Sequence, residues 1–509
     1  MPSTSENNKR IAKNTLILFV RMLLMTAIGL YTSRVILRAL GVSDYGIYDA
    51  VGGFVALFAL LSVMLTNSIN RFLTFELGKG DKDKLKRVFC TSVGVMLLLS
   101  AVVLVLGATV GVWFLNCKMN IPEGRMEAAN VVLACSVCTF IFNLVSIPYN
   151  ASIVAHEKMS AFAYISLVEA TVRLLIAYLI MVSPFDRLVT YAVLLLAMQS
   201  LIRLLYVAYC KRHFEECAYH WIYDKKLLRE MTAFAGWNFL GTGASLVNIQ
   251  GVNVMMNIFF GVNVNAARGI ATQVNAQVYK FVTNFMMAMN PQITKSYAQG
   301  DFAYMHSLIC RGAKFSFFLV LFFLIPLCLE TRQVLVVWLG IVPEYAVPFV
   351  RLTLVATAMN VLSLPLITGL HATGNLKRYM IIVGAVEVTN FPITYIAFKL
   401  GGSPVVSYYI YLGVYFIVML LRLYIIKGLI HMKASLFIRK VYVKVFLVSA
   451  VSCIMPVSAY LSQEESVLRF CVVCAVSFVS TGVCVYVLGL DADERAMIVN
   501  MIRKKIHYK

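Results

Sequence analysis

Two neighbouring apolar segments in the middle of the chain carry polar side chains at helical spacing. On a helix with about 100° between residues, polar residues of the second segment fall within an arc of roughly 60°. They are Gln273, Gln277, Lys280 and Asn284, and the preceding segment repeats the pattern at Gln250, Asn253 and Asn257. Amides donate and accept hydrogen bonds, and an ammonium in a low dielectric attracts anions. The stripes predict a site for a polar, anionic ligand; the alternative is hydrogen bonding between helices.

Charged residues within apolar segments favour the first interpretation, because each costs about 2.5–3.5 kcal/mol at the centre of a membrane helix. Arg21 lies too deep to reach the interface easily, and Lys280 has no acid one turn away. We expect both to face a cavity and to bind phosphate. The remaining predicted substrate-binding residues lie near helix ends, where interfacial capping is the alternative: Asn67, Asn70, Arg71 and Arg268.

Acidic residues are scarcer in the apolar segments. Glu169 and Arg173 are four residues apart, the spacing of an ion pair along one helix. Asp49 and Glu387 have no obvious local partner, so they are the candidates for coupling to H⁺ or Na⁺.

The surrounding chain is too apolar for a soluble domain. Of its 509 residues, 60% are hydrophobic and 14% charged, which predicts an all-α polytopic membrane protein with about fourteen spanning helices. The net charge of +21 is spread over short loops, so it indicates positive-inside topology with both termini cytoplasmic and no nucleic-acid partner.

Enzymatic and metal chemistry are not expected. Most of the 12 cysteines lie inside apolar runs, and their two C-x-x-C spacings lack a second pair at zinc-site distance. No G-x-x-x-x-G-K-[ST] motif occurs. No external loop is long enough for a catalytic domain, so we predict no catalytic residues, no metal and no cofactor.

An internal repeat predicts the domain organisation. A shift of about 220 residues aligns Gly41-Val42 with Gly261-Val262, Asn70 with Asn290, and Gly80-Asp81 with Gly300-Asp301. The two copies would form paired six-helix lobes. We expect an N-lobe over 1–210, a cytoplasmic amphipathic linker over 211–232, a C-lobe over 233–426, a second cytoplasmic linker over 427–440, two further helices within 441–490, and a basic cytoplasmic tail over 491–509.

The stretches Thr32–Asp81 and Ala266–Asp301, which ends in NPQITKSYAQGD, resemble the polysaccharide transport family of the MOP flippase superfamily. This family includes Wzx-type O-antigen and capsule flippases and is related to MATE exporters. The resemblance implies MATE-like lobes around a cationic cavity, in which Arg21 and Lys280 would bind substrate. It also implies a bacterial inner-membrane flippase for an undecaprenyl-pyrophosphate-linked oligosaccharide.

The expected partners are therefore the lipid-linked oligosaccharide, the lipid bilayer and other polysaccharide assembly proteins. The alternative function is a MATE-like cation-coupled multidrug exporter. Such exporters use carboxylates in the membrane, whereas the first apolar segment here carries Arg21.

Overall fold

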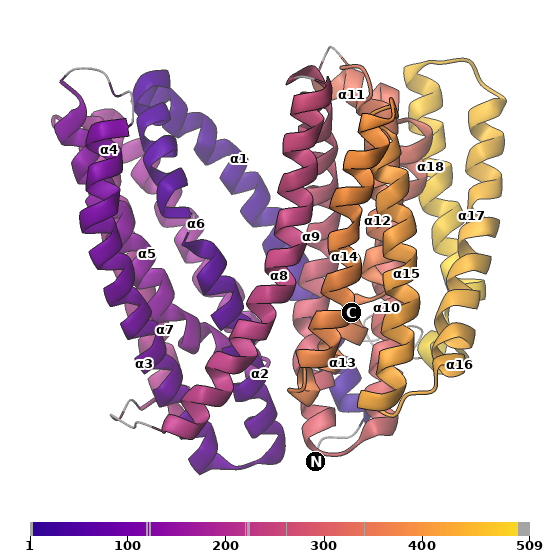
Figure 1. Ribbon diagram of the computed structural model, residues 1–509, viewed down its shortest axis with the longest axis horizontal. Coiled ribbons are helices and arrows are strands. Elements are labelled where there is room, and N and C mark those ends of the chain that lie inside the picture. Colours follow the sequence, from indigo (N-terminus) through magenta and orange to yellow (C-terminus); the bar gives the residue numbers. More distant parts are fainter. Residues whose placement is uncertain are drawn as a thin grey trace, which may run out of the picture. The chain divides into compact units, whose positions relative to one another are not determined.

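The computed structural model describes residues 4–56, 58–118, 121, 124–218, 220, 224–260, 262–339 and 342–496. These residues form helices joined by short turns, and no strand occurs among them. Eleven of the described helical segments are long and apolar enough to cross a membrane. This confirms the all-α membrane fold, while the count of about fourteen spanning helices stays a prediction. The chain divides into two compact units, and Figure 1 shows the helices of each.

Unit 1 comprises residues 1–239 and 294–300. Within it, α5 packs on α7, α3 and α2, and α1 packs on α6. Its helices are α1 (Thr4–Ala56), α2 (Ala59–Lys79), α3 (Lys82–Leu106), α4 (Val112–Lys118), α5 (Met126–Ala155), α6 (Met159–Val182), α7 (Arg187–His213) and the first part of α8 (Lys225–Phe260).

Unit 2 comprises residues 240–293 and 301–509. In this unit α10 packs on α12, α17 and α18, and α15 packs on α14 and α12. Its helices are the rest of α8, α9 (Val262–Ala298) up to residue 293, α10 (Phe302–Leu329), α11 (Thr331–Leu339), α12 (Ala346–Val361), α13 (Leu364–Thr373), α14 (Lys377–Lys399), α15 (Val406–Leu429), α16 (Ala434–Phe437), α17 (Val443–Leu461) and α18 (Val467–Cys484).

The last turn of α9 groups with unit 1 through a buried carboxylate. The Glu157 side chain is fully buried and accepts from Lys295 Nζ at 2.6 Å, and it also pairs with Arg10 Nε at 2.7 Å. Asn14 Nδ2 donates to the Glu157 backbone oxygen at 3.0 Å. Two cations around one enclosed carboxylate offset much of the cost of removing these charges from water.

The turn between α2 and α3 and the turn between α9 and α10 have the same geometry. Gly80 and Gly300 both have a positive φ, of 77° and 75°, which a residue with a side chain rarely adopts. The next residue caps the following helix in each case: Asp81 accepts from Lys84 N and Asp301 from Tyr304 N, both at 3.0 Å. The two turns that the predicted repeat aligns therefore have equivalent geometry.

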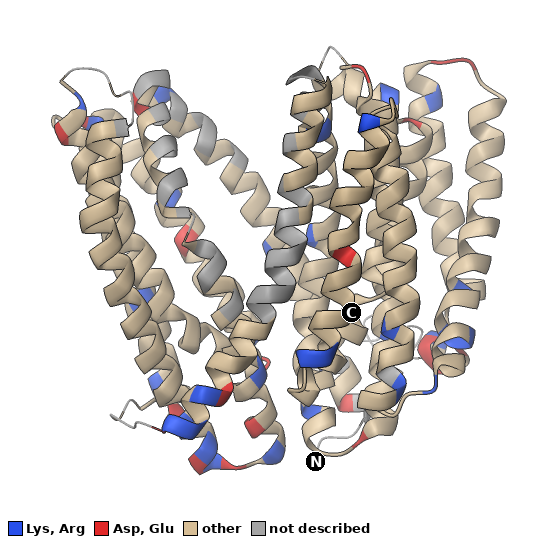
Figure 2. Ribbon diagram, in the orientation of Figure 1, with Lys and Arg blue, Asp and Glu red and all other residues tan. Residues whose placement is uncertain are grey.

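The first helix, α1, is long and kinked. α1 continues through Gly41, whose φ of 78° and ψ of 168° are not helical and produce a kink. The expected linker after α7 contains a short 3₁₀ turn, Glu215–Cys217, before α8 starts at Lys225. Figure 2 shows charged residues gathered near the helix ends of each unit, with few in between.

Candidate functional site

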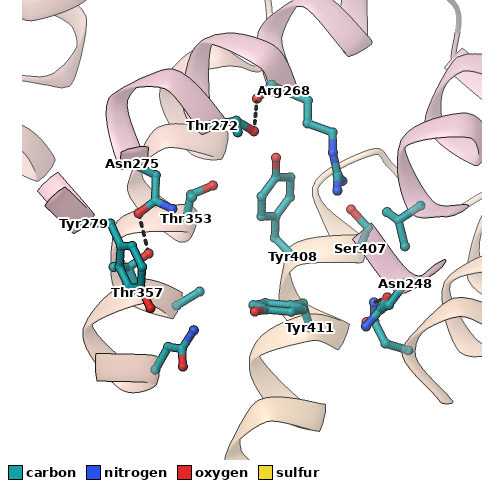
Figure 3. A pocket seen from close by; sticks show the side chains of 14 residues that line it. Asn248, Arg268, Thr272, Asn275, Tyr279, Thr353, Thr357, Ser407, Tyr408 and Tyr411 are labelled. Atoms are coloured by element: carbon teal, nitrogen blue, oxygen red, sulfur yellow. Dashed lines mark hydrogen bonds between the residues drawn. The ribbon is translucent and has the colours of Figure 1, made fainter. Parts of the chain in front are cut away.

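A pocket of about 350 Å³ lies inside unit 2. Five helices line it with amides, hydroxyls and tyrosines together with one arginine, and no Asp or Glu is among its described lining residues (Figure 3). The lining residues are Asn248 and Val252 of α8, Arg268, Thr272, Asn275 and Tyr279 of α9, Thr353, Ala356, Thr357 and Asn360 of α12, Asn390 of α14, and Ser407, Tyr408 and Tyr411 of α15.

One face of α9 supplies four of these side chains. Arg268, Thr272, Asn275 and Tyr279 are spaced by four, three and four residues, which places them within an arc of roughly 60° on a helix. The helix thereby presents a continuous polar strip to the pocket.

Two tyrosines of α15 form an aromatic part of the lining. Figure 3 shows the Tyr408 ring between Arg268 on one side and Thr353 and Asn275 on the other, with the Tyr411 ring one turn further along α15. The Arg268 guanidinium carbon lies 6.0 Å from the centroid of the Tyr408 ring, and Arg268 Nη1 contacts Met256 Sδ at 3.6 Å. The pocket therefore combines flat apolar ring faces with a cation.

Hydrogen bonds from neighbouring hydroxyls orient two of the pocket asparagines. Thr357 Oγ1 donates to Asn275 Oδ1, and Tyr415 Oη donates to Asn360 Oδ1 at 2.7 Å. In both residues the protein occupies the amide oxygen, and among the described residues neither Nδ2 makes a hydrogen bond. Each asparagine is only partly buried, so its amide nitrogen is left to donate to a ligand.

A buried ion pair joins α14 and α15 next to the pocket. Arg422 Nη2 donates to Glu387 Oε1 at 3.1 Å and Arg422 Nε donates to Tyr379 Oη at 3.1 Å. Asn248 Nδ2 donates to the Glu387 backbone oxygen at 3.0 Å, and Asn390 Nδ2 donates to Asn248 Oδ1 at 2.6 Å. The side chains of Asn248 and Asn390, which line the pocket, are thereby hydrogen-bonded to each other and to the backbone of Glu387.

Of the residues predicted from the sequence, Arg268 lines this pocket, whereas the amide stripe of α9 faces elsewhere. At about 100° per residue the stripe is centred roughly 140° away from the pocket face. Gln273, Gln277 and Lys280 are exposed. Lys280 Nζ donates to Gln277 Oε1 at 3.0 Å, and Asn284 Nδ2 donates to the Lys280 backbone oxygen at 2.8 Å. The stripe stays a predicted binding surface.

The α8 stripe has the same relation to the pocket. Asn253 lies roughly 100° or more around the helix from Asn248 and Val252, which line the pocket. The side chains of Gln250 and Asn257 lie outside the described residues.

The remaining predicted substrate-binding residues lie in unit 1. Arg21 is partly buried, with its guanidinium carbon 4.5 Å from the ring centroid of Phe162. The guanidinium carbon of Arg71 lies 4.5–5.6 Å from the centroids of three rings, those of Phe72, Phe75 and Phe234. Asn67 is exposed and Asn70 is partly buried. The predicted pair of Glu169 and Arg173 is confirmed at 3.6 Å.

The structure describes the side chain of one of the two coupling candidates. Glu387 is buried and has the partner that the sequence did not reveal, Arg422, 35 residues further along the chain. The side chain of Asp49 lies outside the described residues. Within the part of the chain that the structure describes, no group of three or more His, Cys, Asp and Glu side chains could hold a metal ion.

Unit 1 contains a second pocket, of about 300 Å³, with a more apolar lining. Its lining residues are Tyr48, Gly52, Val55, Cys135, Ser136, Thr139, Phe140, Asn143, Ala192 and Leu195. The small hydroxyl and amide groups of α5 are the polar contribution, so this pocket favours a less polar ligand than the pocket in unit 2.

Sequence reasoning missed most residues of the unit 2 pocket. The spacing of Arg268, Thr272, Asn275 and Tyr279 was a usable signal, since it is as regular as the stripe. Thr353, Thr357 and Asn360 on α12 have the same spacing of four and three residues. That these faces of α9 and α12 meet at one pocket depends on the packing of helices, which the sequence alone does not reveal.

Comparison with known proteins supports a transporter fold. A family model described as MatE matches residues 18–179, all within unit 1. No curated protein matches the chain.

Solved structures match over much more of the chain. MATE in the straight conformation is 14% identical with a TM-score of 0.69, covering 84% of this chain and 97% of that chain. An outward-facing multidrug resistance MATE family transporter of the MOP superfamily is 14% identical, with a TM-score of 0.67 and coverages of 84% and 96%. A MOP superfamily transporter from Pyrococcus furiosus, described as having a binding pocket of reverse polarity that suggests a different function, is 15% identical, with a TM-score of 0.65 and coverages of 83% and 96%. The chain therefore has the MATE transporter fold.

Proposed function

We propose that this chain is a bacterial inner-membrane flippase that moves an undecaprenyl-pyrophosphate-linked oligosaccharide by alternating access. The oligosaccharide would be a repeat unit of O-antigen, capsule or exopolysaccharide. The MATE transporter fold supports transport across a membrane. The chemistry of the unit 2 pocket supports a glycan as the cargo.

The lining of the unit 2 pocket carries this proposal. Asparagine amides together with threonine, serine and tyrosine hydroxyls surround it, and these groups match the many donors and acceptors of a sugar. The Tyr408 and Tyr411 rings offer flat apolar faces for the C–H side of a pyranose. A carboxylate would favour an organic cation, whereas the described lining contains Arg268 and no acid.

The pyrophosphate needs a cationic contact of its own. Lys280 is exposed and Arg21 is partly buried, and we assign the pyrophosphate to these two cations. The amides of the α8 and α9 stripes would contact the adjoining sugars. Coupling to H⁺ or Na⁺ is part of the proposal, with Asp49 and Glu387 as its candidates.

The second candidate is a multidrug exporter of the MATE type, and the unit 1 pocket favours it. That pocket has Tyr48, Phe140, Val55 and Leu195 in its lining, which suits a hydrophobic molecule. One neighbour in fold is a multidrug resistance transporter, whereas another is described as having reversed pocket polarity and a different function. Pocket polarity is therefore the property on which the two candidates differ.

Deletion of the gene followed by lipid extraction separates the two functions. A flippase deletion should accumulate undecaprenyl-linked glycan in the inner membrane, and expression of the chain should remove it. Unchanged lipids together with raised sensitivity to hydrophobic drugs would overturn the flippase and support the exporter.

A further inference from the structure

The two asparagines whose orientation the protein fixes have a consequence for the charge of the ligand. In both Asn275 and Asn360 a hydroxyl group of the protein donates to the amide oxygen. Such a bond uses one of the two lone pairs of the amide oxygen and leaves both Nδ2 protons available to a ligand. Asn275 on α9 and Asn360 on α12 therefore each have hydrogen-bond donors available to the pocket.

The ion pair lies beside Tyr415, the residue that binds Asn360. Arg422, which can only donate, lies 5.5 Å from the centroid of the Tyr415 ring. Glu387 and Tyr379 hold the guanidinium in place. The Tyr415 hydroxyl is the donor in its bond to Asn360, because an amide oxygen can only accept. This bond leaves the Asn360 nitrogen available to the pocket.

Arg268 adds a positive charge to this arrangement. It lines the same pocket, and no carboxylate is among the described lining residues. Donors from two amides and a cation within one pocket stabilise an acceptor-rich anion more strongly than a neutral hydroxyl, because charge-assisted hydrogen bonds are about twice as strong as neutral ones.

We propose that the unit 2 pocket is a subsite for the carboxylate of an acidic sugar, of the uronic acid class, in which Asn275 Nδ2 and Asn360 Nδ2 donate to the carboxylate oxygens and Arg268 adds a positive charge to the same pocket. The Tyr408 and Tyr411 rings would contact the pyranose. This inference rests on the proposed glycan flippase and specifies its cargo as an acidic glycan. A phosphate group shares the chemistry of the carboxylate, so the test must separate the two anions.

The test measures binding of four probes to the purified full-length protein in detergent by saturation-transfer NMR, at constant ionic strength. The probes are methyl glucuronoside, methyl glucoside, sodium acetate and inorganic pyrophosphate. We expect methyl glucuronoside to bind at least about tenfold more tightly than methyl glucoside, as one charge-assisted hydrogen bond would provide. Equal binding of the two glycosides, or binding of neither, overturns the inference. Tighter binding of pyrophosphate, with displacement of the glucuronoside, also overturns it and assigns the pocket to a diphosphate.

Asn360→Asp and Asn275→Asp are the decisive variants. Each keeps the shape of the side chain and its acceptor for the protein hydroxyl, but exchanges the amide donors for a second acceptor. We expect glucuronoside binding to fall at least about tenfold in each, with glucoside binding unchanged. Asn375→Asp, at an exposed position between α13 and α14, adds the same charge outside the pocket and should bind like the wild type. If the Asp variants do not fold, Arg268→Gln provides the same comparison.

The composition of the accumulated lipid separates this inference from the proposed function. Undecaprenyl-linked glycan that contains a uronic acid supports both. A neutral glycan that accumulates on deletion leaves the flippase standing and overturns the acidic-sugar subsite.

Discussion

Glu387 and Arg422 form an ion pair between α14 and α15, with Arg422 Nη2 3.1 Å from Glu387 Oε1 and both residues buried. The pair borders the pocket through Asn248, which donates to the Glu387 backbone, and through Tyr415, which lies beside Arg422 and donates to Asn360. The ion pair is thus linked through Asn248 and Tyr415 to the lining of the pocket.

Removal of one partner of this pair should destabilise unit 2. Glu387→Ala removes the carboxylate that pairs with the buried Arg422 guanidinium. The hydrogen bond from Arg422 to the Tyr379 hydroxyl remains, but it does not neutralise the charge. A buried ion without its counter-ion costs about 3–5 kcal/mol, so we expect a clearly lower thermal unfolding temperature for the purified protein.

The double replacement is the control for this prediction. Glu387→Met combined with Arg422→Met fills the space without charge, and such replacements are often close to neutral. We expect the double variant to unfold at a higher temperature than Glu387→Ala. A double variant less stable than Glu387→Ala would contradict the interpretation of the pair as a coupled charge unit.

The ion pairs of Asp491, which follows α18, predict a pH dependence of stability. Burial alone would raise the pKa of the Asp491 carboxyl, but the ammonium groups of Lys444 and Lys314 outweigh it and hold this pKa at about 2, below its ordinary value of 3.8. A carboxyl with a lowered pKa stabilises the folded state above its unfolded pKa and loses this contribution as the pH falls toward its folded pKa.

We therefore expect Asp491→Asn to be less stable than the wild type at pH 7, with a difference that is unchanged down to about pH 4 and then shrinks as the pH approaches 2. Thermal unfolding at a series of pH values measures this difference. Ser462→Ala, on an exposed position after α17, serves as the control. A difference that grows on acidification would contradict the ion pairs.

Local patterns in the sequence predicted part of this structure, and the packing between helices decided the rest. The apolar runs predicted the membrane helices, and a spacing of four residues predicted the pair of Glu169 and Arg173. The partner of Glu387 was not predictable, because it lies on the next helix and the pairing depends on the rotation of both helices. The amide stripes were real patterns, yet a helical period alone does not tell which neighbour each face meets.

The two predicted pyrophosphate cations give a prediction about transport. Arg21→Ala and Lys280→Ala should each abolish export of the glycan without loss of membrane insertion, because each removes a charge assigned to the pyrophosphate. Export is measured as surface polysaccharide, and insertion as the amount of protein in the membrane fraction.

Arg173→Ala is the matched control for these variants. It removes a cation that already pairs with Glu169 at 3.6 Å, so export should continue. Normal export in both Arg21→Ala and Lys280→Ala would exclude the assignment of the pyrophosphate to these two residues.

The contact of α2 with the last turn of α9 gives a prediction about a single methyl group. A Cβ added at Gly78 would lie 2.9 Å from Ala298 Cβ and 3.0 Å from Lys295 Cα, so the two backbones could not stay in place. A Cβ added at Gly94 of α3 would meet nothing within 4 Å. Overpacking costs about 1–3 kcal/mol, whereas Gly→Ala in an open part of a helix adds about 0.5–1 kcal/mol of stability.

We therefore expect Gly78→Ala to lower the thermal unfolding temperature and Gly94→Ala to raise it or leave it unchanged. The two variants add the same methyl group to a glycine within a helix, so their difference isolates the contact with α9. Because Lys295 also binds the buried Glu157 at 2.6 Å, displacement of this turn should weaken that ion pair as well. Equal stability of the two variants would show that α9 does not pack on Gly78 as closely as the structure has it.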